Sequence, residues 1–415
     1  MLKNITYRLF PFLIISCLFF PMLKENISSI TVGVLIVNTL LYRLSTKDFK
    51  INSSKIILLT IPFWIIVFTS MFSTNINLSL SHINHGLLFL LIPLVFTYIP
   101  KEIFTEKRME LFIFSLKNIG LAMAVIYLSK YFIDTPAWRF SMNFYNESTF
   151  RNYVYKEFTW FKIHPTYYTT ILIFGAVHSL NLVLQQKKYL QLIYVVSFIG
   201  ITFLLLTKLT TVLMVSLLFY MLLFKNPISV YYKGLVLGFS VLGIGALVLF
   251  TPGVKNRFME LYHSVNVKPI DKTFDSTNIR KAIFDCSVDL FQENWVRGVG
   301  FENLQLELNN CYKSNYNSDF YKDHDYMTHN YYLYIFISSG FLGFLFFLIY
   351  LANIVRISFK SRIFLFQSFI FTILIVCFIE DFLYRQNGIL YFNLLVMCFI
   401  KYIENNESNV LNQLD

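Results

Sequence analysis

The chain has 415 residues, of which 56% are hydrophobic and only 14% charged, and its mean hydropathy is +0.57. Soluble domains carry about 25% charged residues, so the composition excludes an ordinary soluble protein and indicates a polytopic membrane protein. The net charge of +11 does not by itself indicate a nucleic-acid partner, because basic residues of membrane proteins gather in cytoplasmic loops.

The first apolar run, residues 5–23, has a basic flank, but no small-residue cleavage site follows it. We therefore expect a first membrane helix there and not a cleaved signal peptide. Eleven further runs are long enough to cross a hydrocarbon core of ~30 Å. The sequence thus predicts an all-α polytopic membrane protein with about twelve transmembrane helices. The runs are residues 5–23, 27–44, 55–72, 81–99, 109–132, 165–184, 189–206, 209–224, 231–251, 331–355, 363–384 and 388–402.

Charge in the short loops predicts the orientation of the chain. Every second short loop is basic: "RLSTKDFKINSSK", "PKEIFTEKR", "QQKKY", "KNPISVYYK" and "RISFKSR". The alternate short loops carry almost no lysine or arginine. By the positive-inside rule, both termini are expected in the cytoplasm.

This orientation places two long polar segments on the outer side of the membrane. The chain then divides into helices one to five (1–132), a first extracytoplasmic segment (133–164), helices six to nine (165–251), a large extracytoplasmic loop (252–328), helices ten to twelve (329–402) and a cytoplasmic tail (403–415). Long loops of this kind are usually functional, so the large loop is expected to contribute to a functional site.

The five cysteines fall into two groups. Cys17, Cys377 and Cys398 lie in apolar runs and are expected to be small buried hydrophobic residues. Cys286 and Cys311 both lie in the large outer loop, in a compartment that permits disulfides, but their spacing leaves open whether they pair. No cysteine or histidine pairs recur at metal-ligand spacing, so neither a metal nor another cofactor is expected.

Two cations at the outer face are candidates for binding an anionic substrate. Lys208 lies in "LLLTKLTTVL", between two apolar runs, and Arg280 lies in "DSTNIRKAIF", ahead of a helical stretch. Each also has a structural interpretation: the lysine as a side chain that reaches the interface, and the arginine as a solvated loop charge. An arginine can bind phosphate oxygens in pairs, whereas a lysine acts as a point charge.

Three further groups at this face have structural and functional interpretations. His164 opens "HPTYY" and is followed by a proline suited to the first turn of a helix, so it can cap the helix start. Glu380 and Arg385, in "IEDFLYRQNG", end the eleventh run. Pairing of these two residues with each other is the favoured interpretation, and support of a functional site is the other.

His329 is the most informative candidate. It stands with Asn330 at the start of "THNYYLYIFISSGFLG", where the large loop re-enters the membrane, and Gly340 and Gly343 follow in a pattern that permits close helix contact. Histidine is suited to taking a proton from a hydroxyl at ordinary pH. An interfacial histidine bound to the loop is the structural alternative.

In their order along the chain, these segments resemble the O-antigen ligase and polymerase family of bacterial membrane glycosyltransferases. "WVRGVGFENL" followed by "THNYYLYIFISSGFLGFLFFLIY" resembles the glycine-valine-glycine turn and histidine-asparagine helix entry of that family. "STNIRKAIF" and "LLLTKLTTVL" are similar to its cationic segments, and "HPTYY" and "EDFLYRQNGILYF" to blocks of one branch. The resemblance extends from His164 onward, and the first four spans match only as hydrophobic helices.

The resemblance implies a GT-C-like fold and an enzyme that transfers a glycan from undecaprenyl diphosphate to an acceptor hydroxyl at the outer face of the inner membrane. It assigns His329 as the general base and Arg280 and Lys208 to the diphosphate, without metal or nucleotide. Lysine at 208 and Thr207 before it depart from the family pattern, which weakens the assignment of Lys208. Residues expected to support the site are His164, Tyr168, Asn330, Glu380 and Arg385.

The identity of the acceptor stays open at this point. A ligase that uses lipid A core, a polymerase that extends a glycan and an enzyme that glycosylates protein all share the donor and the chemistry. The ligase is slightly favoured over the other two. A transporter of lipid-linked sugars is less favoured, since the chain shows no internal repeat and its polar groups gather at one face. Membrane lipids are the other expected partners, and nucleic acid is not.

Overall fold

The computed structural model describes residues 1–49, 53–73, 75–135, 149–161, 163–225, 259, 262–264, 267–271, 274–322 and 324–411. Within these ranges the chain is helical, and the extended pairing is a single β-bridge between Asp271 and Ser318. The chain divides into two compact units. The first comprises Met1–Phe20, Glu25–Glu110 and His263–Asp415, and the second comprises Pro21–Lys24 and Leu111–Tyr262.

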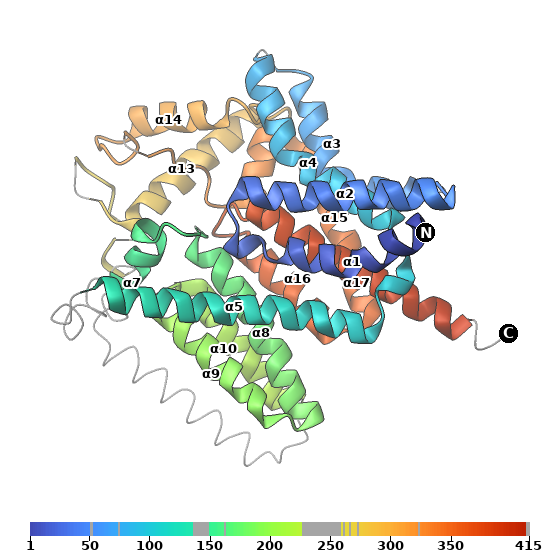
Figure 1. Ribbon diagram of the computed structural model, residues 1–415. Helices are drawn as coiled ribbons and strands as arrows, with labels where there is room; N and C mark the ends of the chain where they lie inside the picture. Colours follow the sequence, from blue (N-terminus) through green and yellow to red (C-terminus); the bar gives the residue numbers. More distant parts are fainter. Residues whose placement is uncertain are drawn as a thin grey trace. The chain divides into compact units, whose positions relative to one another are not determined.

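The first unit joins the amino-terminal helices to the carboxy-terminal ones. In it, α1 packs on α2, α3 on α4, and α15 on α3, while α17 packs on α4 (Figure 1). Its helices are α1 (Leu2–Leu18), α2 (Glu25–Thr46), α3 (Ser53–Ser70), α4 (Ile76–Tyr98), α13 (Ser276–Asn294), α14 (Leu304–Asn315), α15 (Tyr331–Ser361), α16 (Phe364–Val376) and α17 (Gln386–Leu411). Short 3-10 turns occupy Phe20–Met22 and Lys101–Ile103.

The second unit is built around α8, which packs against both α9 and α10. Almost every side chain in the first four turns of α8 is buried. Its helices are most of α5 (Glu106–Asp134), α7 (Thr149–Asn152), which continues into a π-helical turn (Tyr153–Glu157), α8 (Pro165–Gln186), the 3-10 turn Tyr189–Gln191, α9 (Leu192–Leu204) and α10 (Lys208–Phe224).

Six helices in the described ranges are long and apolar enough to cross a membrane, judged by length and composition. They are α2, α4, α5, α8, α15 and the Gln386–Glu407 part of α17. Four shorter apolar helices lie at Lys55–Ser70, Tyr189–Leu204, Lys208–Phe224 and Phe364–Val376. These helices indicate a membrane protein, as expected. The twelve-span plan stays a prediction, and its ninth span, 231–251, lies outside the described residues.

Helix α15 is broken in the middle, at Gly340, where φ is +67° and ψ is −171°. The segment Trp295–Gly300 fills the break: the amides of Val299 and Gly300 donate to the carbonyls of Ile337 and Ser338 at 2.8 and 3.0 Å, and Phe341 N–H donates to Trp295 O at 2.8 Å. Backbone groups that a broken helix exposes need such partners at membrane depth. The glycine-valine-glycine turn is therefore a structural clamp on α15.

The eleventh apolar run forms a shorter helix than expected. Helix α16 ends at Val376, whereas the sequence predicts a span as far as residue 384. The next residues turn back toward the start of α15, and Tyr331 N–H donates to Cys377 O at 2.8 Å. The carboxylates of Glu380 and Asp381 are used in this turn, as described below, so the backbone leaves the helix before it reaches them.

The outer-loop helices α13 and α14 are joined by a disulfide between Cys286 and Cys311, whose Cα atoms are 5.8 Å apart. The pairing that the sequence left open is thus present in the structure. Helix α13 begins with a capping box, in which Asp275 Oδ1 accepts from the amides of Thr277 and Asn278, and Asn278 Oδ1 accepts from Asp275 N–H. Cys17, Cys377 and Cys398 are buried free thiols, as expected.

Candidate active site

The carboxylate of Glu380 lies between Arg280 and His329. Arg280 Nη2 donates to Glu380 Oε1 at 3.0 Å, and His329 Nδ1 lies 3.5 Å from Glu380 Oε2. The Glu380 side chain is only 11% exposed, whereas Arg280 is 46% and His329 32% exposed. A buried carboxylate thus holds together a histidine and an arginine that a substrate can still reach.

Three elements of the first unit meet at this site. Arg280 lies in the second turn of α13, where the Asp275 cap fixes the helix start. His329 immediately precedes the cap of α15, and Glu380 lies in the turn between α16 and α17. The residues are far apart in the sequence, so their juxtaposition depends on the fold of the whole unit.

The backbone of His329 is held by the neighbouring carboxylate, Asp381. Its Oδ2 accepts from His329 N–H at 2.9 Å, and its Oδ1 accepts from Thr328 Oγ1 at 2.7 Å and from Asn330 N–H at 3.2 Å. His329 adopts φ +46°, a left-handed conformation that costs a non-glycine residue on the order of 1–3 kcal/mol. Strain of this kind persists only where surrounding contacts fix it, as the Asp381 carboxylate does here.

The groups around Asp381 shift its pKa in opposite directions. Burial raises the pKa of Asp381 above its ordinary value, and the charge of Glu380 adds to this shift, while His329 and the Thr328 hydroxyl act in the opposite direction. Burial thus outweighs the groups that stabilise the charged form of Asp381. Arg280 supplies a permanent positive charge beside Glu380.

Asn330, expected to support the site, acts as the helix cap of α15. Its Oδ1 accepts from the amides of Tyr332 and Leu333 at 3.0 and 3.2 Å. Capping fixes where α15 begins and hence where His329 stands. The motif histidine-asparagine is thus one unit, in which the asparagine positions the backbone and the histidine side chain faces Glu380.

Glu380 and Arg385 were expected to pair with each other, whereas the ion pair found at Glu380 joins it to Arg280. Arg385 is exposed at the end of the same turn, and its carbonyl accepts from the amides of Gly388 and Ile389 in the first turn of α17. The sequence interpretation missed the longer connection because Arg280 lies a hundred residues away from Glu380 in the chain.

The second unit carries the other predicted cation. Lys208 is half-buried and is the first residue of α10. Arg151 Nη1 donates to the carbonyl oxygens of Leu205 and Leu206 at 3.1 and 3.5 Å, in the turn just before Lys208. A helix N-terminus with basic residues beside it suits an anion. Convergence of Lys208 with the Glu380 cluster stays a prediction.

Two expected supporting residues of the second unit have clear structural roles. His164 caps α8, because its Nδ1 accepts from Thr166 N–H at 3.3 Å. Tyr168 is fully buried, and its hydroxyl donates to Gly120 O in α5 at 2.8 Å. The helix-cap interpretation therefore describes His164, and Tyr168 stabilises helix packing.

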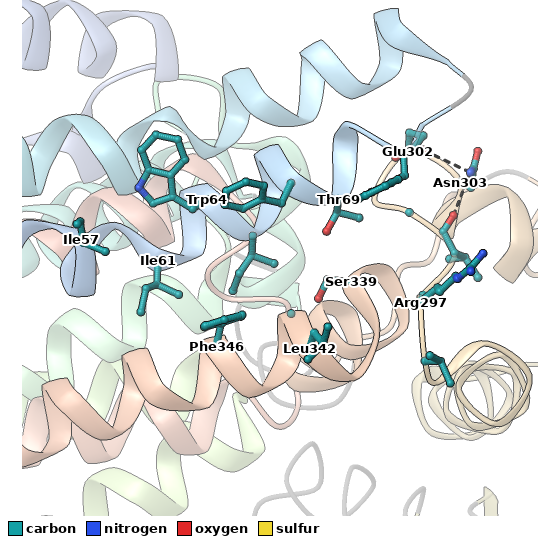
Figure 2. A pocket seen from close by; sticks show the side chains of 18 residues that line it. Ile57, Ile61, Trp64, Thr69, Arg297, Glu302, Asn303, Ser339, Leu342 and Phe346 are labelled. Atoms are coloured by element: carbon teal, nitrogen blue, oxygen red, sulfur yellow. Dashed lines mark hydrogen bonds between the residues drawn. The ribbon is translucent and has the colours of Figure 1, made fainter.

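Sequence reasoning missed three polar residues of interest. Asp381 stands next to Glu380 in the motif, but nothing local indicates that it binds the Thr328 hydroxyl and the amides of His329 and Asn330. Arg151 lies in the short helix α7, in a segment without a motif. Glu302 follows the glycine-valine-glycine turn and lines a cavity beside α15 (Figure 2). The sequence signal available for Glu302 was an acidic residue close after the glycine-valine-glycine turn.

Comparison with known proteins gives one family. Residues 192–348 match the family model described as O-Antigen ligase. No curated protein matches the chain. The matched range contains Lys208, Arg280 and His329, whereas Glu380 lies beyond it. That family suggests glycan transfer of the O-antigen ligase or polymerase type, so the resemblance expected from the sequence is confirmed over residues 192–348.

Proposed function

We propose that the protein is an O-antigen ligase that transfers a glycan from undecaprenyl diphosphate to a sugar hydroxyl of an acceptor at the outer face of the bacterial inner membrane. The observation that carries the proposal is the Glu380 carboxylate held between Arg280 and His329. The family match over residues 192–348 supports the same chemistry. The basic short loops support an outward-facing site with both termini in the cytoplasm.

The donor side of the reaction needs positive charge. When the bond between the anomeric carbon and the diphosphate breaks, negative charge develops on the leaving oxygens. Cations placed where charge develops give the most effective electrostatic catalysis. Arg280 has five N–H donors in a planar fork, of which one nitrogen contacts Glu380, so it is suited to bind a phosphate as well. Lys208 is assigned the same leaving group as a point charge.

The acceptor side needs a base. His329 Nδ1 faces Glu380 Oε2, which favours the tautomer with its proton on Nδ1 and leaves Nε2 to accept the proton of the acceptor hydroxyl. The hydroxyl oxygen then attacks the anomeric carbon, and the diphosphate leaves with the bonding electrons. A single displacement of this kind inverts the anomeric centre. Each step uses the chain's own residues.

The reaction is testable with rival acceptors. The purified protein in proteoliposomes would receive lipid-linked repeat units together with lipid A core, a free glycan and a candidate protein. We expect glycan on lipid A core with an inverted linkage. Extension of the glycan alone would instead indicate a polymerase, modification of the protein an oligosaccharyltransferase, and no transfer to any acceptor would overturn the proposal.

Arg280 offers an independent test of the donor assignment. Arg280→Ala should reduce use of the lipid-linked donor by on the order of 100-fold, because it removes a charge that stabilises the leaving group. Arg280→Lys should lose less, since it keeps the charge but not the planar fork. The KM for the donor and kcat, measured in both variants, would check this. Unchanged kinetics in Arg280→Ala would remove arginine from the donor site.

A further inference from the structure

A cavity of about 1180 Å³ lies between α3, the first turns of α15 after its break, and the segment 296–303. All three belong to the first unit. Its wall is apolar over most of its length, with Ile57, Ile61 and Phe346 at one end (Figure 2). Arg297, Glu302 and Asn303 gather at the other end. The cavity is thus amphipathic, with an apolar body and a polar end.

The polar end contains a buried carboxylate that lacks a full set of partners. Glu302 is only 9% exposed, and its Oε2 has no hydrogen-bond partner. Its Oε1 receives a long contact from Asn303 Nδ2 at 3.4 Å. Leaving a buried acceptor unsatisfied is costly, and more so for a charged group. A ligand that donates hydrogen bonds to Oε2 would account for this arrangement.

The carboxylate stands on a firmly held segment. The amides of Val299 and Gly300 are bound to the carbonyls of Ile337 and Ser338 in α15, and Asn303 Nδ2 donates to Val299 O at 2.9 Å. Gly298 at φ +73° allows this segment to approach α15, because a Cβ there would lie 2.5 Å from Ser338 O. A binding group on so constrained a backbone is already oriented before a ligand arrives.

The apolar body has the dimensions of an alkyl chain. The wall formed by α3 between Ile57 and Thr69 is roughly 18 Å long at 1.5 Å per helical residue. Both α3 and α15 are apolar helices, so a chain in the cavity remains in hydrocarbon surroundings. A ligand that fits both halves therefore has a hydrocarbon chain and a polar group rich in hydrogen-bond donors.

The charged residues at the polar end indicate which ligand the cavity binds. A diphosphate next to the Glu302 carboxylate would be repelled, so the donor headgroup is poorly suited to this end. Sugar hydroxyls donate hydrogen bonds to carboxylates, so the Glu302 end suits a saccharide. We propose that this cavity binds the acyl chain of a membrane-anchored saccharide acceptor, and that Glu302 accepts a hydrogen bond from one of its sugar hydroxyls. This inference rests on the proposed function and names its acceptor as a lipid.

Binding experiments test the inference without requiring catalysis. The purified full-length protein in phospholipid nanodiscs would be titrated with lipid A core, with its deacylated saccharide, and with undecaprenyl diphosphate glycan. Leu342→Trp narrows the cavity from an exposed position in α15, and Leu345→Trp is its control, since Leu345 is exposed on the same helix but does not line the cavity. Glu302→Gln removes the charge, and Glu293→Gln, at an exposed position in α13, controls for it.

We expect Leu342→Trp and Glu302→Gln each to weaken binding of lipid A core about 10-fold, the size of one charged hydrogen bond or a lost chain contact. The controls and the binding of the polyprenyl donor should stay unchanged. The deacylated saccharide should bind weakly and respond only to Glu302→Gln. Weaker donor binding in Leu342→Trp would assign the cavity to the polyprenyl chain and overturn the inference, as would unchanged binding of lipid A core in both variants.

The two proposals fail in different ways. A wild-type protein that binds lipid A core through these residues but transfers no glycan to it would contradict the proposed function and keep the acceptor site. Glycan transfer to lipid A core that continues at the wild-type rate and affinity in both cavity variants would keep the proposed function and contradict the acceptor site.

Discussion

Glu380 contacts both Arg280, which the proposed chemistry assigns to the donor, and His329, which it assigns to the acceptor. Its carboxylate contacts Arg280 through one oxygen and faces His329 with the other. Neighbouring Asp381 holds the His329 backbone in its left-handed conformation. The two adjacent acidic residues of this turn therefore have different roles. Glu380 contacts the side chains of Arg280 and His329, and Asp381 fixes the backbone that carries the histidine.

Replacing the carboxylate should uncouple these groups. Glu380→Gln keeps the size of the side chain but removes the charge that holds Arg280 and favours the Nδ1 tautomer of His329. We expect the transfer rate to fall on the order of 100-fold with little loss of thermal stability. Rates with saturating donor and acceptor would measure this, and Glu293→Gln provides a matched control in the same unit. An unchanged rate would show that Glu380 has no part in catalysis.

The sequence predicted some of this residue-level arrangement. The positions of His329 and Arg280 follow from a motif and from the cost of placing charge at a membrane face. The sequence did not predict that Glu380 pairs with Arg280, because Arg385, only five residues away, is a plausible local partner. Only the turn after α16 brings Glu380 to an arginine on a different helix.

At the scale of elements, the break in α15 brings the segment Trp295–Gly300 against this helix. Gly340 and Gly298 allow two backbones to approach so closely that a Cβ on Gly340 would lie 2.4 Å from Val296 O. Glycine is needed at Gly340 for both its positive φ and this contact. The glycine pair that the sequence assigned to helix packing therefore has two roles, since Gly343 faces Ile65 of α3 whereas Gly340 forms the break.

Gly340→Ala should destabilise the protein by about 2–4 kcal/mol, because the new methyl group meets backbone atoms that cannot move aside. The control is Gly33→Ala in α2, where nothing lies within 4 Å of the added Cβ. There, alanine should be neutral or slightly stabilising, since it is the better helix former. Thermal unfolding in detergent would compare the two, and equal midpoints would contradict the assigned break.

The disulfide between α13 and α14 should stabilise the outer loop that carries Arg280. Its cysteines are 25 residues apart, and closing such a loop contributes about 3 kcal/mol in the chain-entropy account. A reducing agent should lower the unfolding temperature of the wild type but not that of the Cys286→Ser, Cys311→Ser double variant. The three remaining cysteines are buried free thiols, so a similar effect in the double variant would contradict the pairing.

The elements themselves were largely predictable from apolar length. Helices occupy the predicted positions wherever the structure describes those runs, since twenty apolar residues have few other conformations available in a membrane. The boundaries were less predictable. Helix α16 is shorter than its apolar run because polar tertiary contacts of Glu380 and Asp381 replace helical ones, and hydropathy does not contain that information.

For the molecule as a whole, topology follows from the distribution of charge. The alternation of basic and neutral short loops predicts cytoplasmic termini and an outer site. A green fluorescent protein fused after the carboxy terminus should fluoresce, and alkaline phosphatase fused after Asn294 should be active, because the first reporter works inside and the second outside. The reverse pattern would place the candidate site on the cytoplasmic leaflet and contradict its assignment to a periplasmic reaction.

The central claim is that His329 is the base of a glycan transfer reaction, and a single-turnover measurement tests it most directly. The purified protein, loaded with undecaprenyl diphosphate glycan, would be mixed with lipid A core and the rate of linkage formation followed. His324→Ala, an exposed histidine in the same outer loop, is the control and should keep the wild-type rate. We predict a loss of roughly 100- to 10,000-fold in His329→Ala, the usual contribution of a positioned general base, with donor binding intact. A rate in His329→Ala equal to that of the control would contradict the account.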